Sequence, residues 1–302
     1  MRVVIAGSSG LIGTALVAGL RAENHEVLRL VRRKAQGPDE IQWSPSAALD
    51  PSVLDGCDAV VNLCGASIAD KRWTGAYKQE LRDSRIGPTE VLGEAVSQAH
   101  VPTLINASAV GFYGDTGDNK VGESSSSGEG FLADLCVEWE KASLRAANNN
   151  TRVVNIRTGI VLSKAGGMIP KLIPLYKLAL GGRLGDGRQY FPWITLEDHI
   201  RAVKFLLEST TVDGPVNLTG PAPVTNAEFN RAFGKVVHRP SPWVVPGFAL
   251  KALVGEFAST GILGGQRAIP AKLEDAGFTF EHHTIREALD ATLTPGVGLN
   301  NE

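Results

Sequence analysis

Three glycines near the start of the chain have a spacing that lets a peptide backbone bind phosphate. Gly7, Gly10 and Gly13 follow an apolar strand pattern, and a helical pattern then runs to about Ala22. In this setting Gly7 permits a sharp turn, Gly10 lets a pyrophosphate approach closely, and Gly13 lets the helix pack on the strand. The helix N-terminus offers free N–H groups and a positive dipole end to the phosphates. We therefore predict a dinucleotide site, against the alternative of a tight turn without ligand. Its predicted residues in this turn are Gly7, Ser8, Ser9, Gly10, Leu11, Ile12 and Gly13.

Basic residues stand where the ribose 2′ group of such a dinucleotide would be bound. An NAD site usually has Asp or Glu at the end of the second strand, about 20 residues after the glycines. Here the expected strand 26–31 is followed by Arg32 and Arg33. A guanidinium can bind a 2′-phosphate through two charge-assisted hydrogen bonds, whereas a carboxylate would repel it. We therefore predict NADP(H) rather than NAD(H), with a solvated basic loop as the alternative.

Strand and helix patterns alternate through the first half of the chain and would position this turn. Strands are expected at residues 3–6, 26–31, 58–64, 103–108 and 152–162. Helices are expected up to about residue 22, at 79–99 with a start or kink at Pro88, and at 131–147. This alternation predicts an α/β fold with a Rossmann-type, doubly wound parallel sheet. Ligands of such sheets bind beyond the carboxyl ends of the strands.

Beyond Leu162 the pattern changes to a loop-rich segment with paired glycines and several prolines. We expect an NADP-binding domain at residues 1–162 and a substrate-facing region at 163–302. Helical patterns in this region cover residues 196–208, 226–237 and 248–258. A smaller, mixed C-terminal domain is expected from about residue 243 to 302.

Composition limits the classes of partner. The 302 residues include 30 Lys and Arg and 32 Asp and Glu, which gives a formal net charge of −2. This near equality of positive and negative charges argues against a nucleic-acid partner. The three cysteines do not form a disulfide framework and fit a reducing compartment. The sequence shows no signal-peptide pattern, no membrane-spanning apolar run and no metal-ligand spacing, so we expect a cytoplasmic protein without a metal site or a membrane partner.

Further sequence blocks give the chain a family resemblance. Asn62-Leu-Cys-Gly65 follows the third expected strand, and Ser108 and Tyr113-Gly114 follow the fourth. With the glycine turn, they resemble an extended short-chain dehydrogenase/reductase. The chain is similar, more specifically, to the epimerase family proteins of the NAD-dependent epimerase/dehydratase superfamily, which end in a small domain. Further blocks carry this likeness over essentially the whole chain: Arg72-Trp73, Ser84-Arg85, Trp139-Glu140, Gly185 to Gln189, Phe191 to Asp198, Thr225 to Phe229 and Gly264 to Arg267.

The resemblance implies more cofactor contacts at matching positions. Val31 and Arg32 are implied at the adenosine phosphate, and Val161 near the nicotinamide. Glu80 and Arg85 are implied at the adenine end, although without the resemblance they would be interpreted as a solvated helical face. With the neighbours of these positions, the predicted contacts outside the glycine turn are Val31, Arg32, Arg33, Leu63, Cys64, Gly65, Glu80, Arg85 and Val161.

The expected helix 131–147 lacks the catalytic pair that the resemblance implies. That chemistry uses a Tyr to carry the substrate proton, and a Lys four residues later lowers the pKa of the Tyr. Cys136 and Glu140 fall nearest to these two positions. A Glu would raise the pKa of a neighbouring acid rather than lower it. Lys141 is one residue, roughly 100°, out of register.

Ser108 and Tyr113 remain as the predicted catalytic residues. The resemblance places a Ser that orients the substrate carbonyl at the end of the fourth strand, which matches Ser108. Without a Lys nearby, Tyr113 would keep a pKa of about 10, too high for an efficient base at neutral pH. It could still donate a proton, so we expect slow reduction by NADPH in preference to oxidation by NADP⁺.

Two functions agree with these observations. The first is an NADP(H)-dependent oxidoreductase or epimerase acting on an unknown small carbonyl or sugar-like substrate. The second is a non-catalytic NADP(H)-binding regulator that presents a surface to a protein partner. The glycine turn fits both functions, the missing Tyr–Lys pair favours the second, and the presence of Ser108 favours the first.

Overall fold

A parallel sheet of seven strands forms the centre of the structure, a computed structural model that describes residues 1–148 and 150–294. Every neighbouring pair of strands in it is parallel. The strand order is that of a doubly wound Rossmann sheet and confirms the expected fold class. From one edge to the other, the strands are β12 (Gly214–Leu218), β7 (Arg152–Thr158), β5 (Thr103–Ala109), β4 (Ala59–Asn62), β1 (Arg2–Ala6), β2 (Glu26–Val31) and β3 (Glu40–Gln42).

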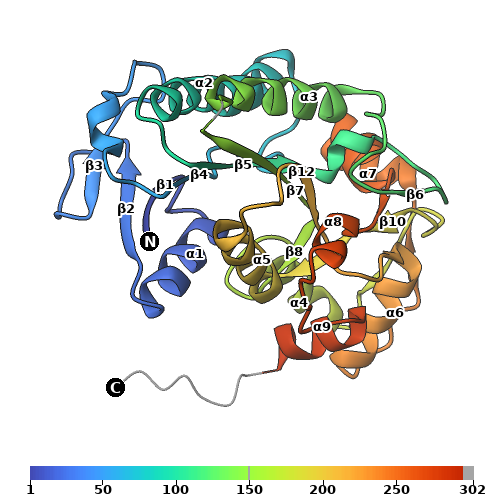
Figure 1. Cartoon of the computed structure of the whole chain (residues 1–302). Helices are drawn as coiled ribbons and strands as arrows, with labels where there is room; N and C mark the ends of the chain where they lie inside the picture. The colour runs from blue at the N-terminus through green and yellow to red at the C-terminus, as the bar shows by residue number, and fades with distance from the viewer. Residues whose placement is uncertain (149, 295–302) are drawn as a thin grey trace.

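Helices cover both faces of this sheet (Figure 1). One face carries α1 (Leu11–Ala22) and α5 (Leu196–Glu208), and the other carries α2 (Gly75–Gln98) and α3 (Phe131–Ser143). Val3 and Ile5 of β1 pack with α1 and α5, whereas Val4 and Ala6 pack with α2. Because side chains alternate between the two faces and both faces are buried, the central strands have continuous apolar sequences.

Most of the other elements form a smaller mixed region with an apolar core of its own, which contains Trp193, Phe229 and Phe233. Its helices are α4 (Ile169–Lys177), α6 (Asn226–Val236), α7 (Gly247–Val254), α9 (Ile285–Leu293) and the π-helical turn η4 (Ala258–Ile262). Its short strands pair in twos: β8 (Ile160–Leu162) with β11 (Trp193–Thr195), β9 (Gly182–Leu184) with β14 (Trp243–Val245), β10 (Tyr190–Phe191) with β13 (Val224–Thr225), and β6 (Lys120–Val121) with β15 (Arg267–Ala268). The short helix α8 (Ala271–Asp275) instead places Leu273 in the core of the large sheet.

The sheet takes its edge strand from beyond the domain boundary expected near residue 163. β12 pairs with β7 along its whole length, from Gly214 opposite Val154 to Leu218 opposite Thr158. The division into domains at that residue stays a prediction. Residues 295–302 of the expected C-terminal domain lie outside the described residues.

Two expected elements have other bounds in the structure. α2 begins at Gly75 and runs through Pro88, so the proline neither starts nor ends it. The strand expected at 152–162 is divided at Gly159, where a Cβ would lie only 2.2 Å from the Pro192 carbonyl oxygen. Beyond this close approach, β8 leaves the large sheet and pairs with β11 instead.

Candidate functional site

A cleft of about 570 Å³ lies at the carboxyl ends of β1, β4, β5 and β7. The glycine turn, the segments that follow β4 and β5, one side of α3, the start of β8 and part of η4 line it. The predicted site residues that line the cleft are Gly7, Gly10, Leu11, Ile12, Gly13, Leu63, Cys64, Gly65, Arg85, Ser108 and Val161. The predicted residues outside this lining are Ser8, Ser9, Val31, Arg32, Arg33, Glu80 and Tyr113.

The three glycines of the turn differ in what excludes a side chain. Gly7 has a φ of 77°, and a Cβ there would lie 2.6 Å from the Leu63 carbonyl group. At Gly13 a Cβ would lie 2.4 Å from the Gly7 oxygen. At Gly10, which precedes α1, the nearest atom would be 3.6 Å away, an ordinary contact. The chain's own packing therefore requires Gly7 and Gly13, whereas Gly10 leaves room beside the α1 N-terminus, as a bound pyrophosphate needs.

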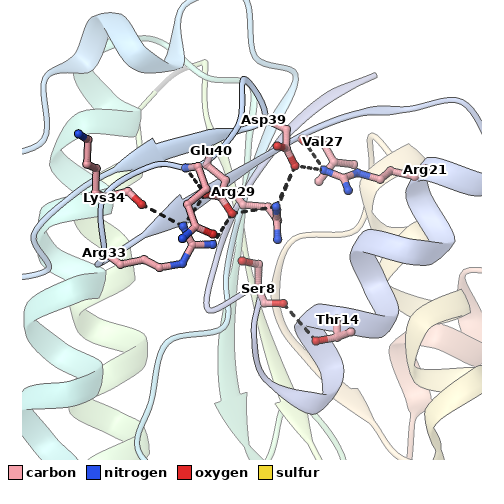
Figure 2. Close-up of polar contacts among 10 residues, drawn as sticks. Ser8, Thr14, Arg21, Val27, Arg29, Arg33, Lys34, Asp39 and Glu40 are labelled. Carbon is pink, nitrogen blue, oxygen red and sulfur yellow. Dashed lines mark hydrogen bonds and ion pairs between the residues drawn. The ribbon is translucent and has the colours of Figure 1, made fainter.

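The two arginines that follow β2 are held differently, and Figure 2 shows the contacts of the second, Arg33. Arg33 donates two hydrogen bonds of 2.6 Å to the Glu40 carboxylate, and this holds the pKa of Glu40 well below its usual range. Arg32 is exposed, and among the described residues its side chain makes no hydrogen bond or ion pair. Its positive charge nevertheless acts to lower the pKa of the Cys64 thiol, which lines the cleft and whose pKa is raised by burial. Arg32 is thus available to a phosphate at this end of the cleft, whereas Arg33 is already paired.

The two residues of α2 implied as cofactor contacts have separate positions. Arg85 is buried in the cleft wall, where it donates to the Ala66 carbonyl oxygen at 2.8 Å and lies 5.1 Å from the centre of the Trp139 ring. Glu80 is exposed outside the cleft and pairs with Lys71 at 2.9 Å. Contact with a cofactor stays a prediction for both residues.

Ser108 lines the cleft at the carboxyl end of β5, and its hydroxyl is bonded to Glu140 of α3. Ser108 Oγ donates to Glu140 Oε1 at 2.7 Å. Arg157 of β7 donates two hydrogen bonds of 2.8 Å, one to each oxygen of the same carboxylate. Ser108 and Arg157 are opposite each other in the β5–β7 register, which brings both to Glu140. The negative charge nearest to the Lys position that the resemblance implies is therefore neutralised by a buried guanidinium.

Tyr113 belongs to the same hydrogen-bond network but does not line the cleft. It ends the 3-10 turn η2 (Val110–Tyr113), and its hydroxyl donates to Asn217 Oδ1 at 2.7 Å. The Tyr113 hydroxyl oxygen in turn accepts from Arg157 Nη1 at 3.0 Å. Burial raises the pKa of Tyr113 above its ordinary value, although Arg157 opposes this. The hydroxyl proton is thus engaged inside the protein, and a catalytic role for Tyr113 stays a prediction.

Cys136 of α3 lines the cleft near the position of the superfamily's Tyr. It is buried, and this burial raises the pKa of its thiol to about 12. The thiol is therefore protonated at neutral pH, the form in which a cysteine is a poor nucleophile.

Three residues in or beside this part of the cleft were not predicted from the sequence: Arg157, Thr158 and His199, of which Thr158 belongs to the lining. Thr158 lines the cleft, and its Oγ1 lies 3.1 Å from Nε2 of the buried His199. Burial lowers the pKa of His199 to about 4, so its ring is neutral at physiological pH. An arginine inside an otherwise apolar strand pattern is the one signal that could have identified Arg157.

Two further kinds of feature are absent from the described part of the chain. Within residues 1–148 and 150–294, no group of three His, Cys, Asp or Glu side chains is placed to bind a metal ion. None of the helices in those ranges is long and apolar enough to cross a membrane.

Known proteins are similar to this chain over nearly its whole length. The NAD dependent epimerase/dehydratase family matches residues 3–218, and a domain of unknown function, DUF1731, matches residues 245–292. An epimerase family protein of Mycobacterium bovis is 59% identical over 296 residues, which are 97% of this chain and 98% of that protein.

Two solved structures share the fold and more than 30% of the sequence. The crystal structure of human epimerase family protein SDR39U1 (isoform 2) with NADPH has a TM-score of 0.88 and 31% identity, and the match covers 97% of this chain and 99% of that one. The nucleoside-diphosphate sugar epimerase of Corynebacterium glutamicum has a TM-score of 0.81 and 36% identity, and the match covers 97% of this chain and 58% of that one.

Proposed function

This chain belongs to the NAD-dependent epimerase/dehydratase family, and on that premise we propose that it is an NADP(H)-dependent oxidoreductase or epimerase for a small carbonyl or sugar-like compound. The observation that carries the proposal is the glycine turn at the cleft, where the chain's packing explains Gly7 and Gly13 but not Gly10. The exposed Arg32 and the NADPH in the human relative's structure support a 2′-phosphorylated cofactor. When bound, such a cofactor supplies or accepts a hydride.

The chain's own residues would bind and orient the two ligands. The N-terminus of α1 would bind the pyrophosphate, and Arg32 would bind the 2′-phosphate. Ser108 is the hydroxyl group at the carboxyl end of β5 that a substrate oxygen would meet in the cleft, and Glu140 holds that hydroxyl in place. Tyr113 would act on a substrate only after its hydrogen bond to Asn217 breaks.

Two measurements test this function. Calorimetric titration should show NADPH binding more tightly than NADH. A screen of carbonyl compounds that follows NADPH loss should then identify a substrate whose rate falls in Ser108→Ala, by about 10²-fold or more if Ser108 assists proton transfer. Failure to bind either cofactor, or tighter binding of NADH, would contradict the proposal.

A non-catalytic NADP(H)-binding regulator of a protein partner is the second candidate. It is favoured by the residues near the Tyr and Lys positions, because Cys136 is a protonated thiol and Glu140 is held by Arg157. Tight NADPH binding with no consumption of any compound in the screen would favour this candidate over the enzyme.

A further inference from the structure

We propose that the smaller region carries a surface that binds an anionic phospholipid bilayer, and we call this surface the Trp243 face. It consists of two segments, residues 164–185 and 229–255, which are joined by the pairing of β9 with β14. None of its residues lines the cleft, so it is independent of the proposed function. Three features carry the proposal: exposed apolar side chains, an excess of positive charge, and a hollow lined by cations.

Most of the large apolar side chains that the described residues leave exposed lie on the Trp243 face. Seven of the ten belong to its two segments: Leu175, Leu178, Leu180, Trp243, Val244, Phe248 and Leu253. Single exposed apolar side chains are normal on any protein surface. Their concentration in two paired segments instead indicates a surface that contacts another apolar phase or partner.

Backbone contacts bring the leucines at the end of α4 together with Trp243. α4 ends in a Schellman motif, in which the Leu180 N–H donates to the Leu175 carbonyl oxygen at 2.8 Å. The carbonyl oxygen of Ala179 accepts from the Trp243 indole N–H at 2.7 Å. The polar edge of the indole is thus bonded within the protein, while Trp243 remains 56% exposed. The part of this side chain left for a partner is therefore mainly apolar ring surface.

Positive charge is concentrated on the same two segments. Residues 164–185 contain four Lys or Arg, residues 229–255 contain another four, and neither segment contains an Asp or Glu. The whole chain has a formal net charge of −2, so the remaining residues are net acidic. In the described part of the chain, none of these eight cations forms an ion pair. The face therefore attracts an anionic surface, and each Lys or Arg close to that surface strengthens the binding.

A hollow of about 390 Å³ lies beside the exposed leucines. Its lining includes the cations Arg231, Lys235 and Arg239 together with His238, and no large apolar side chain. Arg239 connects the hollow to the end of α4, because its Nε donates to the Lys177 carbonyl oxygen at 3.2 Å. Three cations around one hollow suit the phosphate of a lipid head group, since guanidinium groups bind phosphate through charge-assisted hydrogen bonds.

This arrangement favours a bilayer over a second copy of the chain or an acidic protein. A symmetric dimer would bring the same positively charged face against itself. An acidic protein would need preformed pockets for side chains as exposed as Leu178 and Phe248, whereas acyl chains rearrange around them. A phospholipid joins a phosphate to apolar chains, just as the hollow adjoins the leucines. Trp, Phe and Leu combined with Lys and Arg are typical of faces that lie at the boundary between head groups and acyl chains.

The sequence led us to expect no membrane partner, because it contains no long apolar run. Such a run is needed to cross a bilayer but not to lie on its surface. Binding at the surface depends on which side chains gather on one face of the folded protein. The pairing of β9 with β14 brings together two segments that are far apart in the sequence, and this is what assembles the Trp243 face.

Co-sedimentation of the full chain with vesicles tests the proposal. We expect binding to vesicles of equal parts phosphatidylcholine and phosphatidylglycerol, binding at least about tenfold weaker to phosphatidylcholine alone, and a loss of affinity as salt is added. Trp243 reports on insertion, because the other four tryptophans are buried: Trp43, Trp73, Trp139 and Trp193. Its emission should shift to shorter wavelength on anionic vesicles and be quenched by brominated acyl chains.

Matched variants separate the apolar contribution from the charged one. Leu178→Ser and Lys235→Gln should each weaken binding to the anionic vesicles by about threefold to tenfold. Their controls, Leu144→Ser and Lys141→Gln, change an exposed leucine and an exposed lysine outside the Trp243 face and should bind like the wild type. Thermal unfolding of the four variants checks that each is folded.

Several outcomes would overturn the proposal. They are binding to neither kind of vesicle, equal binding to both, equal losses in the controls, and binding without quenching of Trp243. Sedimentation velocity without vesicles tests a second copy, because a dimer that Leu178→Ser dissociates would assign the face to self-association. Binding of polyglutamate without vesicle binding would assign it to an acidic protein. Binding of inorganic phosphate without vesicle binding would reduce it to a site for a free anion.

Discussion

Two walls of the cleft are built from different kinds of contact. The glycine wall, residues 7–13 from the end of β1 into the first turn of α1, depends on close backbone contacts, within the turn itself at Gly13 and with the Leu63 carbonyl group at Gly7. The Ser108 wall consists of Ser108, Glu140 and Arg157, which are separated by 32 and 17 residues and meet only because β5, β7 and α3 pack together. The first wall depends on the absence of side chains, and the second on the mutual neutralisation of buried charges. A change in each wall should therefore have a different consequence.

The largest effect is expected when the charge of Glu140 is removed. Glu140→Gln leaves the Arg157 guanidinium buried without a carboxylate, and breaking a buried ion pair from one side lowers the free energy of unfolding by about 3–5 kcal/mol. Urea denaturation measures this difference. Glu80→Gln is the control, because it breaks an exposed pair with Lys71 and should cost less than about 1 kcal/mol. Similar losses in both variants would show that the Glu140–Arg157 pair does not hold the Ser108 wall.

The next largest effect is expected on NADPH binding, when the Arg32 side chain that follows β2 is removed. Arg32→Ala should weaken NADPH binding by about 1.5–3 kcal/mol, the range for hydrogen bonds to a charged group, and leave NADH binding nearly unchanged. Lys34→Ala removes another exposed cation nearby and should have a smaller effect. Titration calorimetry with both cofactors provides the comparison. Equal losses for NADPH and NADH in Arg32→Ala would mean that Arg32 does not bind the 2′-phosphate.

A pair of glycine variants should separate folding from binding within the glycine wall. Gly13→Ala places a Cβ against the Gly7 oxygen and should lower the free energy of unfolding by about 1–3 kcal/mol. Gly10→Ala meets no close atom and should change it by less than about 0.5 kcal/mol. Its methyl group would instead obstruct the pyrophosphate and weaken NADPH binding. Wild-type NADPH affinity in Gly10→Ala would remove the main support for a cofactor at this turn.

The glycine wall and most of the sheet could be predicted from the sequence because their signals are local. An apolar run followed by spaced glycines specifies a strand, a turn and a helix within about 20 residues of chain. The division of the strand at Gly159 could not be predicted, since its cause is the approach of Pro192 from a distant segment. The short edge strand β3 was also missed, because three residues carry too little pattern.

The arrangement of the Ser108 wall could not be predicted, because the effect of the Glu140 charge depends on its partner, Arg157. In isolation, Glu140 is a negative charge where the superfamily has a positive one, which argues against catalysis. The register of β5 and β7 places Arg157 opposite Ser108, and only then is the charge of Glu140 balanced. Tyr113 is similar, since its bonds to Asn217 and Arg157 come from strands that the sequence pattern does not place beside it.

The smallest predicted effect on stability comes from His199 of α5, whose ring lies against Thr158, the residue after Arg157. Burial lowers the pKa of His199 to about 4 in the folded protein, whereas an unfolded histidine titrates near 6.5. Protons therefore bind the unfolded chain first as the pH falls. The stability that the neutral ring contributes is complete above about pH 6.5 and is lost as the pH falls towards 4. Between pH 7.5 and 5.5, this one group should lower the free energy of unfolding by about 1.4 kcal/mol.

Urea denaturation at the two pH values, in the wild type and in two variants, isolates this contribution. His199→Asn keeps a polar side chain near Thr158 but cannot titrate, so its loss of stability on acidification should be about 1 kcal/mol smaller than that of the wild type. His283→Asn removes an exposed histidine and should retain the wild-type loss. Because other groups also titrate in this range, the difference between the variants is the informative quantity. If His199→Asn lost as much stability as the wild type, the buried ring against Thr158 would not be the group whose protonation destabilises the folded protein.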